Sequence, residues 1–201
     1  MTRPLLVMDM KKLGSDIGSI AKSYNLSGHN STCGIHVHVS RKGVKDTDVT
    51  IGKLLLLFAK FETQITSFAR RSSSRWAKVS HKDKERLKAN PKAFCDEERS
   101  DRYRAINLCN EATIEFRVFK GTNRSSTIEA IVMFCNAIID AAENIGIDDI
   151  DTVSWTDLFK EKIGQPEYDV MFQYMKGKGI EVSGSIPASE PASVATDFSD
   201  E

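Results

Sequence analysis

The sequence has no excess of charge of either sign, because 28 Lys and Arg are matched by 28 Asp and Glu over 201 residues. This balance disfavours both a globally basic nucleic-acid-binding protein and an acidic solvated coil. Long hydrophobic runs are also lacking: the longest, residues 54–59, is far shorter than the roughly 20 residues that span a membrane. The apolar run near the N-terminus is too short for a signal peptide. We therefore expect a cytoplasmic protein that binds neither nucleic acid nor membrane.

Cysteine is scarce, and no two of the four cysteines form a C-x-x-C pair or a zinc-type spacing. A disulfide-stapled secreted domain is shorter and richer in cysteine. The pattern therefore favours reduced thiols. Cys33 stands where a predicted strand begins, and we interpret it as a small buried residue rather than a nucleophile, because the sequence places no base beside it.

Helical periodicity is present in several segments. Residues 9–24 have apolar side chains at three- and four-residue spacing, with Asp9 as a candidate cap, although two glycines weaken this helix. Residues 48–70 carry a broad apolar stripe that predicts one deeply buried helix. Ser126 and Glu129 form a capping-box pattern at the start of a helix that ends near residue 146. Weaker patterns predict helices near residues 154–163 and 166–176.

Two segments alternate as strands do. Residues 33–40 and 113–119 are rich in β-branched and aromatic residues, and a shorter strand over 105–108 precedes the second at hairpin distance. The combination predicts an α+β fold in which helices pack on a mainly antiparallel sheet. We expect one domain over residues 1–182. Residues 183–201 read as a disordered acidic tail, because they contain no basic residue.

Each predicted strand has one apolar face and one face with titratable groups. Alternation places His36 with His38 in the first strand, and Glu115 with Arg117 in the second. If the strands share a sheet with matched faces, these four side chains converge. Such a face suits a divalent cation held by Glu and His, with Arg binding a phosphate or carboxylate. The alternative is a solvated histidine pair beside a cross-strand ion pair.

Residues 70–104 are strongly polar, with twelve Lys or Arg against six Asp or Glu. One interpretation is a solvated loop with short helices. The other is a basic wall that faces an anionic ligand.

Three stretches resemble one family. They are Cys33-Gly-Ile-His-Val-His-Val, Arg102-Tyr-Arg-Ala-Ile-Asn-Leu, and Thr113-Ile-Glu-Phe-Arg-Val-Phe-Lys-Gly-Thr122. Together they are similar to the amidoligases, which are carboxylate–amine ligases related to glutamate–cysteine ligase and more distantly to glutamine synthetase. The resemblance covers about residues 3–145. Members of this family occur in bacteria, their phages and fungi.

The resemblance implies an antiparallel sheet curved into a funnel, with helices on its outer face. It also implies amide-bond formation in which ATP activates a carboxylate as an acyl phosphate, which an amine then attacks. Magnesium would neutralise the phosphate charge. The implied partners are a small-molecule or peptide carboxylate and an amine.

Residue by residue, the resemblance implies that Glu115 is a metal ligand and that Arg117 clamps a phosphate or acyl phosphate. His36 and His38 would be active-site residues that contact metal, nucleotide or substrate, with His38 as a second candidate metal ligand. Further contacts to nucleotide or substrate carboxylate would come from three arginines: Arg70, Arg71 and Arg104.

One departure from the family pattern concerns the metal. Family members carry a Glu-x-Glu-type pattern on strands well before the His-x-His strand, whereas the only acidic residues upstream of Cys33 are Asp9 and Asp16. We therefore expect an incomplete fold that lacks its first strands, with a second chain or self-association completing the sheet. The leading hypothesis is a ligase or its C-terminal portion. The alternatives are a non-catalytic binding or assembly module and a hydrolase in which His-x-His activates water.

Overall fold

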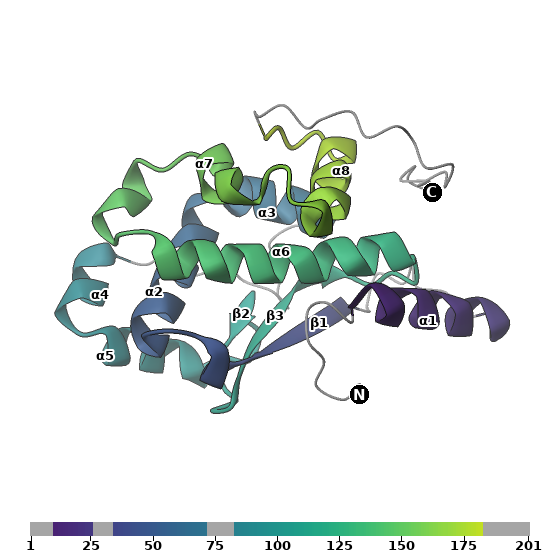
Figure 1. Cartoon of the computed structure of the whole chain (residues 1–201). Coiled ribbons are helices and arrows are strands. Elements are labelled where there is room, and N and C mark those ends of the chain that lie inside the picture. The colour runs from purple at the N-terminus through teal and green to yellow at the C-terminus, as the bar shows by residue number, and fades with distance from the viewer. Residues whose placement is uncertain (1–9, 26–33, 72–82, 183–201) are drawn as a thin grey trace.

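The computed structural model describes residues 10–25, 34–71 and 83–182 (Figure 1). Asp9, Cys33 and the predicted tail lie outside these residues. The strands are β1 (Gly34–Ser40), β2 (Ile106–Asn107) and β3 (Thr113–Lys120). The helices are α1 (Met10–Ser23), α2 (Thr47–Lys60), α3 (Glu62–Ala69), α4 (Lys84–Ala89), α5 (Pro91–Asp96), α6 (Ser125–Asn144), α7 (Trp155–Phe159) and α8 (Asp169–Gly177).

The three described strands form one antiparallel sheet in the order β1-β3-β2. His38 of β1 pairs with Glu115 of β3, and Asn107 of β2 pairs with Glu115 from the other side. The predicted α+β class and the antiparallel pairing of the two motif strands are therefore confirmed. The hairpin between β2 and β3 is confirmed too, although β2 is shorter than the predicted 105–108.

A register shift interrupts the pairing of β1 with β3. Ile35 pairs with Phe119 while Val37 pairs with Phe116, so His36 faces two residues of β3, Arg117 and Val118. Such a bulge bends the strand and alters its alternation. Strict alternation of buried and exposed residues therefore fails at the end of β3, where the neighbours Val118 and Phe119 are both buried.

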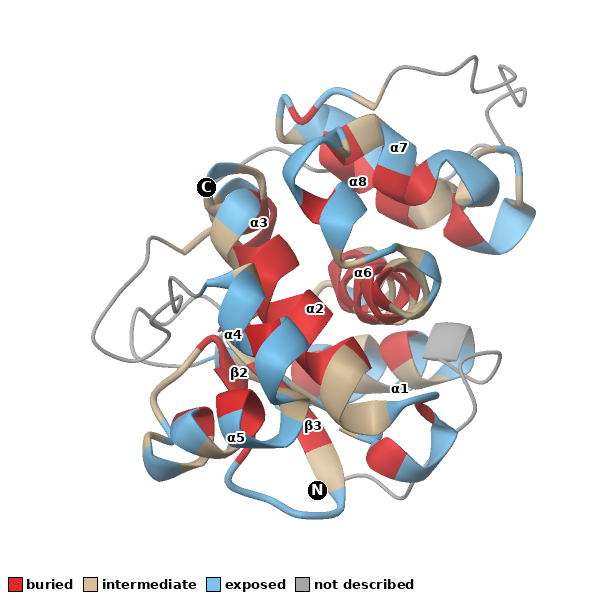
Figure 2. Cartoon of the chain, turned by 90° about the vertical axis from the view of Figure 1, so that its left-hand side faces the viewer, coloured by how far each residue is buried: buried red, intermediate tan, exposed pale blue. Residues whose placement is uncertain are grey.

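Helices α2, α3 and α6 pack on the apolar face of the sheet. The Phe116 ring lies 5.9 Å from that of Phe58 in α2, and the Phe119 ring lies 6.3 Å from Phe68 in α3 and 6.1 Å from Phe134 in α6. Figure 2 looks along α6, which is largely buried among its neighbours. By length and composition α6 would pass for a membrane span, but 67% of its most apolar window is buried within the protein. Core packing accounts for that apolarity.

Two details of the predicted helices are wrong. The single helix over 48–70 is divided at Phe61, where the backbone leaves helical geometry and the ring packs edge-on against Trp155 at 5.4 Å. The capping box is absent, because α6 begins one residue before Ser126 and its N-cap, Arg124, makes no side-chain capping bond.

The close approach of α1 to the start of α6 explains the two glycines of α1. A Cβ atom at Gly14 would lie 3.0 Å from the Ser125 carbonyl oxygen, and one at Gly18 would lie 3.3 Å from the Asn123 carbonyl oxygen. Both positions are therefore crowded by backbone. These glycines cost helix propensity, but they let the two segments pack closely.

Lysines of α2 bind the ends of neighbouring elements. The Lys53 ammonium donates to the carbonyl oxygens of Glu143 and Ile145, where α6 ends. The Lys60 ammonium donates to three carbonyls in and after the 3₁₀ turn Asp148–Asp151 (η4), at 2.6–2.7 Å. Burial lowers the pKa of both lysines. These contacts fix the turns that follow α6.

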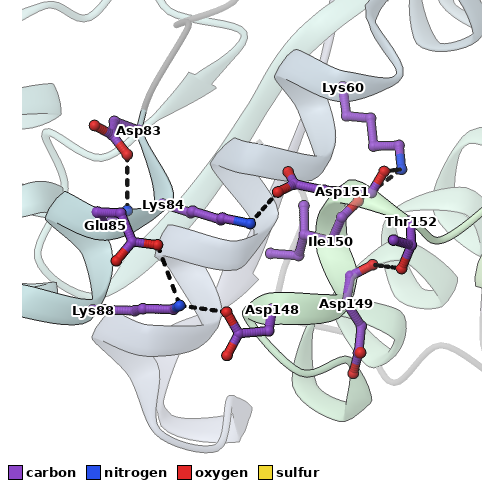
Figure 3. Close-up of polar contacts among 10 residues, drawn as sticks. All are labelled: Lys60, Asp83, Lys84, Glu85, Lys88, Asp148, Asp149, Ile150, Asp151 and Thr152. Carbon is purple, nitrogen blue, oxygen red and sulfur yellow. Dashed lines mark hydrogen bonds and ion pairs between the residues drawn. The ribbon is translucent and has the colours of Figure 1, made fainter.

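Charged side chains between residues 83 and 104 are extensively paired. Lys84 and Lys88 of α4 reach Asp151 and Asp148 of η4 (Figure 3). Other bridges join Arg86 to Glu97 and Lys92 to Asp96. Residues 83–104 carry seven Lys or Arg against six Asp or Glu, and this described part consists of short helices with a solvated surface. Half of the basic excess of residues 70–104 lies in residues 72–82, outside the described residues, so the basic wall stays a prediction there.

Candidate functional site

The site is built around the carboxylate of Glu115 in β3, whose side chain is only 8% exposed. One oxygen, Oε1, lies 2.8 Å from His36 Nδ1 and 3.0 Å from Arg117 Nη1. His38 Nε2 lies 3.7 Å from the same oxygen. The predicted convergence of the two histidines, Glu115 and Arg117 is therefore confirmed. Charge-assisted contacts of this kind are shorter and stronger than neutral hydrogen bonds.

Asn107 fixes the other side of the carboxylate. Its amide Nδ2 donates to Glu115 Oε2, and its Oδ1 accepts the backbone N–H of Cys109 at 2.9 Å. Because the Cys109 N–H can only donate, it sets which way the Asn107 amide points. In the sequence, Asn107 stands in the stretch Arg102-Tyr-Arg-Ala-Ile-Asn-Leu and is not among the predicted site residues. The predicted hairpin could have indicated this contact, because antiparallel pairing of its strands places Asn107 opposite Glu115.

The His36 ring is oriented by Glu115. With Nδ1–H donating to the ionised carboxylate, Nε2 keeps its lone pair and makes no hydrogen bond within the described residues. Burial lowers the pKa of His36, the Arg117 charge lowers it further, and Glu115 partly offsets both. His36 is thereby kept neutral near pH 7, with a free basic nitrogen on the surface of the sheet. This carboxylate–imidazole arrangement is the one that orients a general base in many enzymes.

His38 is placed differently from His36. Its Nε2 is beyond hydrogen-bond distance of Glu115, and its Nδ1 lies 3.3 Å from Thr113 Oγ1. With 49% of the side chain exposed, it lies at the rim of the cluster. The two histidines of the motif therefore have unequal roles.

Arg117 has donors to spare. Nη1 binds Glu115, while the buried Nε atom finds no hydrogen-bond partner in the described part of the chain. The Arg117 side chain as a whole is 18% exposed, so part of it reaches the surface near the Glu115 cluster. A guanidinium with unused N–H groups can bind a carboxylate or phosphoryl oxygen there.

The three other predicted arginines do not act as a group. Arg104 Nε lies 3.4 Å from a carboxylate oxygen of both Glu98 and Asp101, which balance its charge. Arg70 Nη2 donates to the Gly121 carbonyl at 3.3 Å. Arg71 alone reaches the start of β1, where its Nη1 lies against the backbone of Gly34.

The described residues do not fit a magnesium ion. Mg²⁺ requires a near-octahedral set of oxygen ligands, commonly carboxylates and water. Here one carboxylate is available, and its oxygens already accept from Asn107, His36 and Arg117. Among the described residues, no group of three or more His, Cys, Asp or Glu is arranged to hold a metal. Glu115 and His38 as magnesium ligands therefore gain no support from this geometry.

Known proteins add no direct identification of the site. The chain matches no protein-family model, no curated protein and no solved structure. What bears on function is the chemistry of the Glu115 cluster.

Proposed function

We propose that the chain acts in an ATP-dependent carboxylate–amine ligase, in which the Glu115–His36 pair activates the amine. The observation that carries the proposal is the 2.8 Å contact from His36 Nδ1 to Glu115 Oε1, which leaves Nε2 free beside Arg117. The resemblance of both strands to amidoligases supports the same chemistry. The equal numbers of basic and acidic residues are compatible with this proposal, because the surface that binds the amine needs no overall positive charge.

The bond-forming step assigns a role to each side chain of the pair. The amine nitrogen attacks the acyl carbon and forms the new C–N bond, while its proton passes to His36 Nε2. The bond between the acyl carbon and the phosphate oxygen of the acyl phosphate breaks, and phosphate leaves with that electron pair. Glu115 stabilises the imidazolium that forms, because its carboxylate lies against Nδ1. Arg117 binds the oxygen on which negative charge develops.

ATP would supply the phosphoryl group that turns the carboxylate into an acyl phosphate. The acidic residues for a metal are not among the described residues, so they would come from elsewhere in the chain or from another chain. In this proposal the curved funnel sheet is completed by strands beside β1. Among the described strands, β1 pairs with β3 alone.

The second candidate is a binding or assembly module without catalysis. Among the described strands β1 is an edge strand, which favours this candidate, because an edge strand presents backbone groups for pairing with another chain. The single carboxylate in the cluster points the same way. Analytical ultracentrifugation tests this candidate: a dimer without nucleotide turnover supports it, and a strictly monomeric chain contradicts the assembly role.

The ligase proposal is tested by ADP and phosphate release with mixtures of carboxylates and amines, using the intact chain and His36→Gln. We expect turnover that falls by about 100-fold or more in His36→Gln, the range typical for loss of a general base. The matched variant His38→Gln should lose less, since His38 is outside hydrogen-bond distance of Glu115. Equal losses would contradict the assigned base, and absence of nucleotide turnover in every mixture would contradict the ligase.

A further inference from the structure

Gly34, Arg71 and His36 meet at one point on the surface of the sheet. A Cβ atom built on Gly34 would lie 3.0 Å from Arg71 Nη1 and 3.5 Å from His36 Nε2. Both nitrogen atoms are therefore within about 6.5 Å of each other. The missing side chain of Gly34 is what allows the Arg71 guanidinium to approach the strand so closely.

Neither nitrogen is used within the described part of the chain. The backbone N–H of Arg71 donates to the Thr66 carbonyl, but its guanidinium makes no hydrogen bond or ion pair there. His36 uses Nδ1 for Glu115 and leaves Nε2 unbonded. The surface thus presents a permanent cation next to a neutral hydrogen-bond acceptor.

From this pairing we infer that the amine substrate is an amino acid, with its amine on His36 Nε2 and its carboxylate on Arg71. This inference rests on the proposed function, because it takes Nε2 as the atom that receives the proton of the amine. It goes further in naming the substrate class and in giving Arg71 a role that Arg70 and Arg104 do not share.

The distances suit such a ligand. Because the two nitrogens are at most about 6.5 Å apart, one small ligand with its donor and acceptor on adjacent or next-adjacent carbon atoms can make hydrogen bonds of about 2.7–3.2 Å to both. An α- or β-amino acid meets that requirement. A simple alkylamine would leave Arg71 without a partner, and a simple anion would place negative charge against the lone pair of Nε2.

The test is NMR titration of the His36 ring signals in the intact chain, without ATP. Glycine and β-alanine are compared with ethylamine, acetate and inorganic phosphate. We expect at least one amino acid to bind about tenfold or more tightly than ethylamine, acetate and phosphate. Ethylamine binding as tightly as both amino acids would overturn the inference. So would acetate or phosphate binding as tightly, because the site would then be one for anions only.

Two variants assign the carboxylate contact. Arg71→Gln should abolish the preference for amino acids over ethylamine, whereas the neighbouring Arg70→Gln should retain it, since Arg70 donates to the Gly121 carbonyl instead. Gly34→Ala should weaken amino-acid binding too, because its Cβ would crowd the Arg71 guanidinium. Retention of the preference in Arg71→Gln would overturn the inference.

Binding and turnover separate this inference from the proposed function. Amino-acid binding through Arg71 in a chain that never releases ADP would contradict the ligase and leave the amino-acid site standing. Turnover with ethylamine at the rate seen with amino acids would contradict the amino-acid site and leave the ligase standing.

Discussion

Two charged regions of this molecule differ in how far their charged groups are exposed to water. Around Glu115, one nearly buried carboxylate gathers Asn107, His36 and Arg117, and donors or lone pairs remain unused at its edge. Between α4 and η4, Lys84 and Lys88 face Asp151 and Asp148 in solvent-exposed pairs (Figure 3). The first region concentrates polar groups where water is partly excluded. The region between α4 and η4 holds its charged groups in contact with water.

The difference teaches which polar groups are candidates for chemistry. Exposed ion pairs gain little, because water screens the charges and the long side chains lose freedom. A buried carboxylate costs desolvation unless every oxygen is bonded, so its partners are held in fixed positions. A hollow of about 470 Å³ lies beside Lys60 in the exposed region. The Lys60 ammonium there already donates to three backbone carbonyls. The Lys60 ammonium is therefore not available to a ligand in this hollow.

The largest expected effect comes from Glu115→Gln. The substitution removes the negative charge that stabilises a protonated His36. It also places an amide NH₂ group where one carboxylate oxygen of Glu115 now accepts hydrogen bonds from His36 and Arg117 or from Asn107. We expect about 100-fold or greater loss of turnover, with unfolding free energy lowered by about 1–3 kcal/mol for the disrupted buried contacts. Turnover assays and urea unfolding measure both. Full activity in Glu115→Gln would contradict the site.

The same variant predicts a shift in the titration of His36. Glu115 raises the pKa of His36, so its removal should lower that pKa further below the ordinary histidine value. The neutral form would then persist to lower pH than in the parent chain. NMR titration of the ring measures the change, and a higher pKa in the variant would contradict the contact.

An intermediate effect is expected for Asn107→Ala. The substitution leaves Glu115 Oε2 and the Cys109 N–H without their partner, at a cost of about 1–3 kcal/mol each at most in a buried setting. Because Asn107 positions Glu115, turnover and the His36 titration should change as well. Asn107→Asp is the matched variant: it keeps the acceptor for Cys109 but places a second carboxylate against Glu115. Loss of stability without any change at His36 would mean that Asn107 acts on the fold alone.

The smallest effect is expected in the exposed region. Lys84→Ala combined with Lys88→Ala removes the cations from two pairs that lie in water, so neither turnover nor melting temperature should change measurably. Thermal unfolding at low and high salt checks this. A clear drop in melting temperature would show that these pairs hold η4 in place, and the contrast with the Glu115 cluster would be weaker than described.

Much of the sheet was predictable, because alternation is a local property of the chain. His36 and His38 had to share one face, as did Glu115 and Arg117, once both segments were strands. The break at Phe61 was not predictable, since a continuous apolar stripe does not reveal where two helical segments part to fit Trp155. The start of α6 was missed for a related reason: the segment before it packs against the glycines of α1.

The sequence by itself determined the strands, their polar and apolar faces, and the residue types that meet at the site. Only the tertiary structure decided that His36 rather than His38 bonds to Glu115 and that Asn107 holds the second oxygen. It also decided that Arg71 approaches Gly34 while Arg104 pairs with Glu98 and Asp101. The physical reason is that residue spacing fixes direction along one strand, whereas distances between strands depend on register. A bulge opposite His36 altered that register, and no local pattern encodes where it falls.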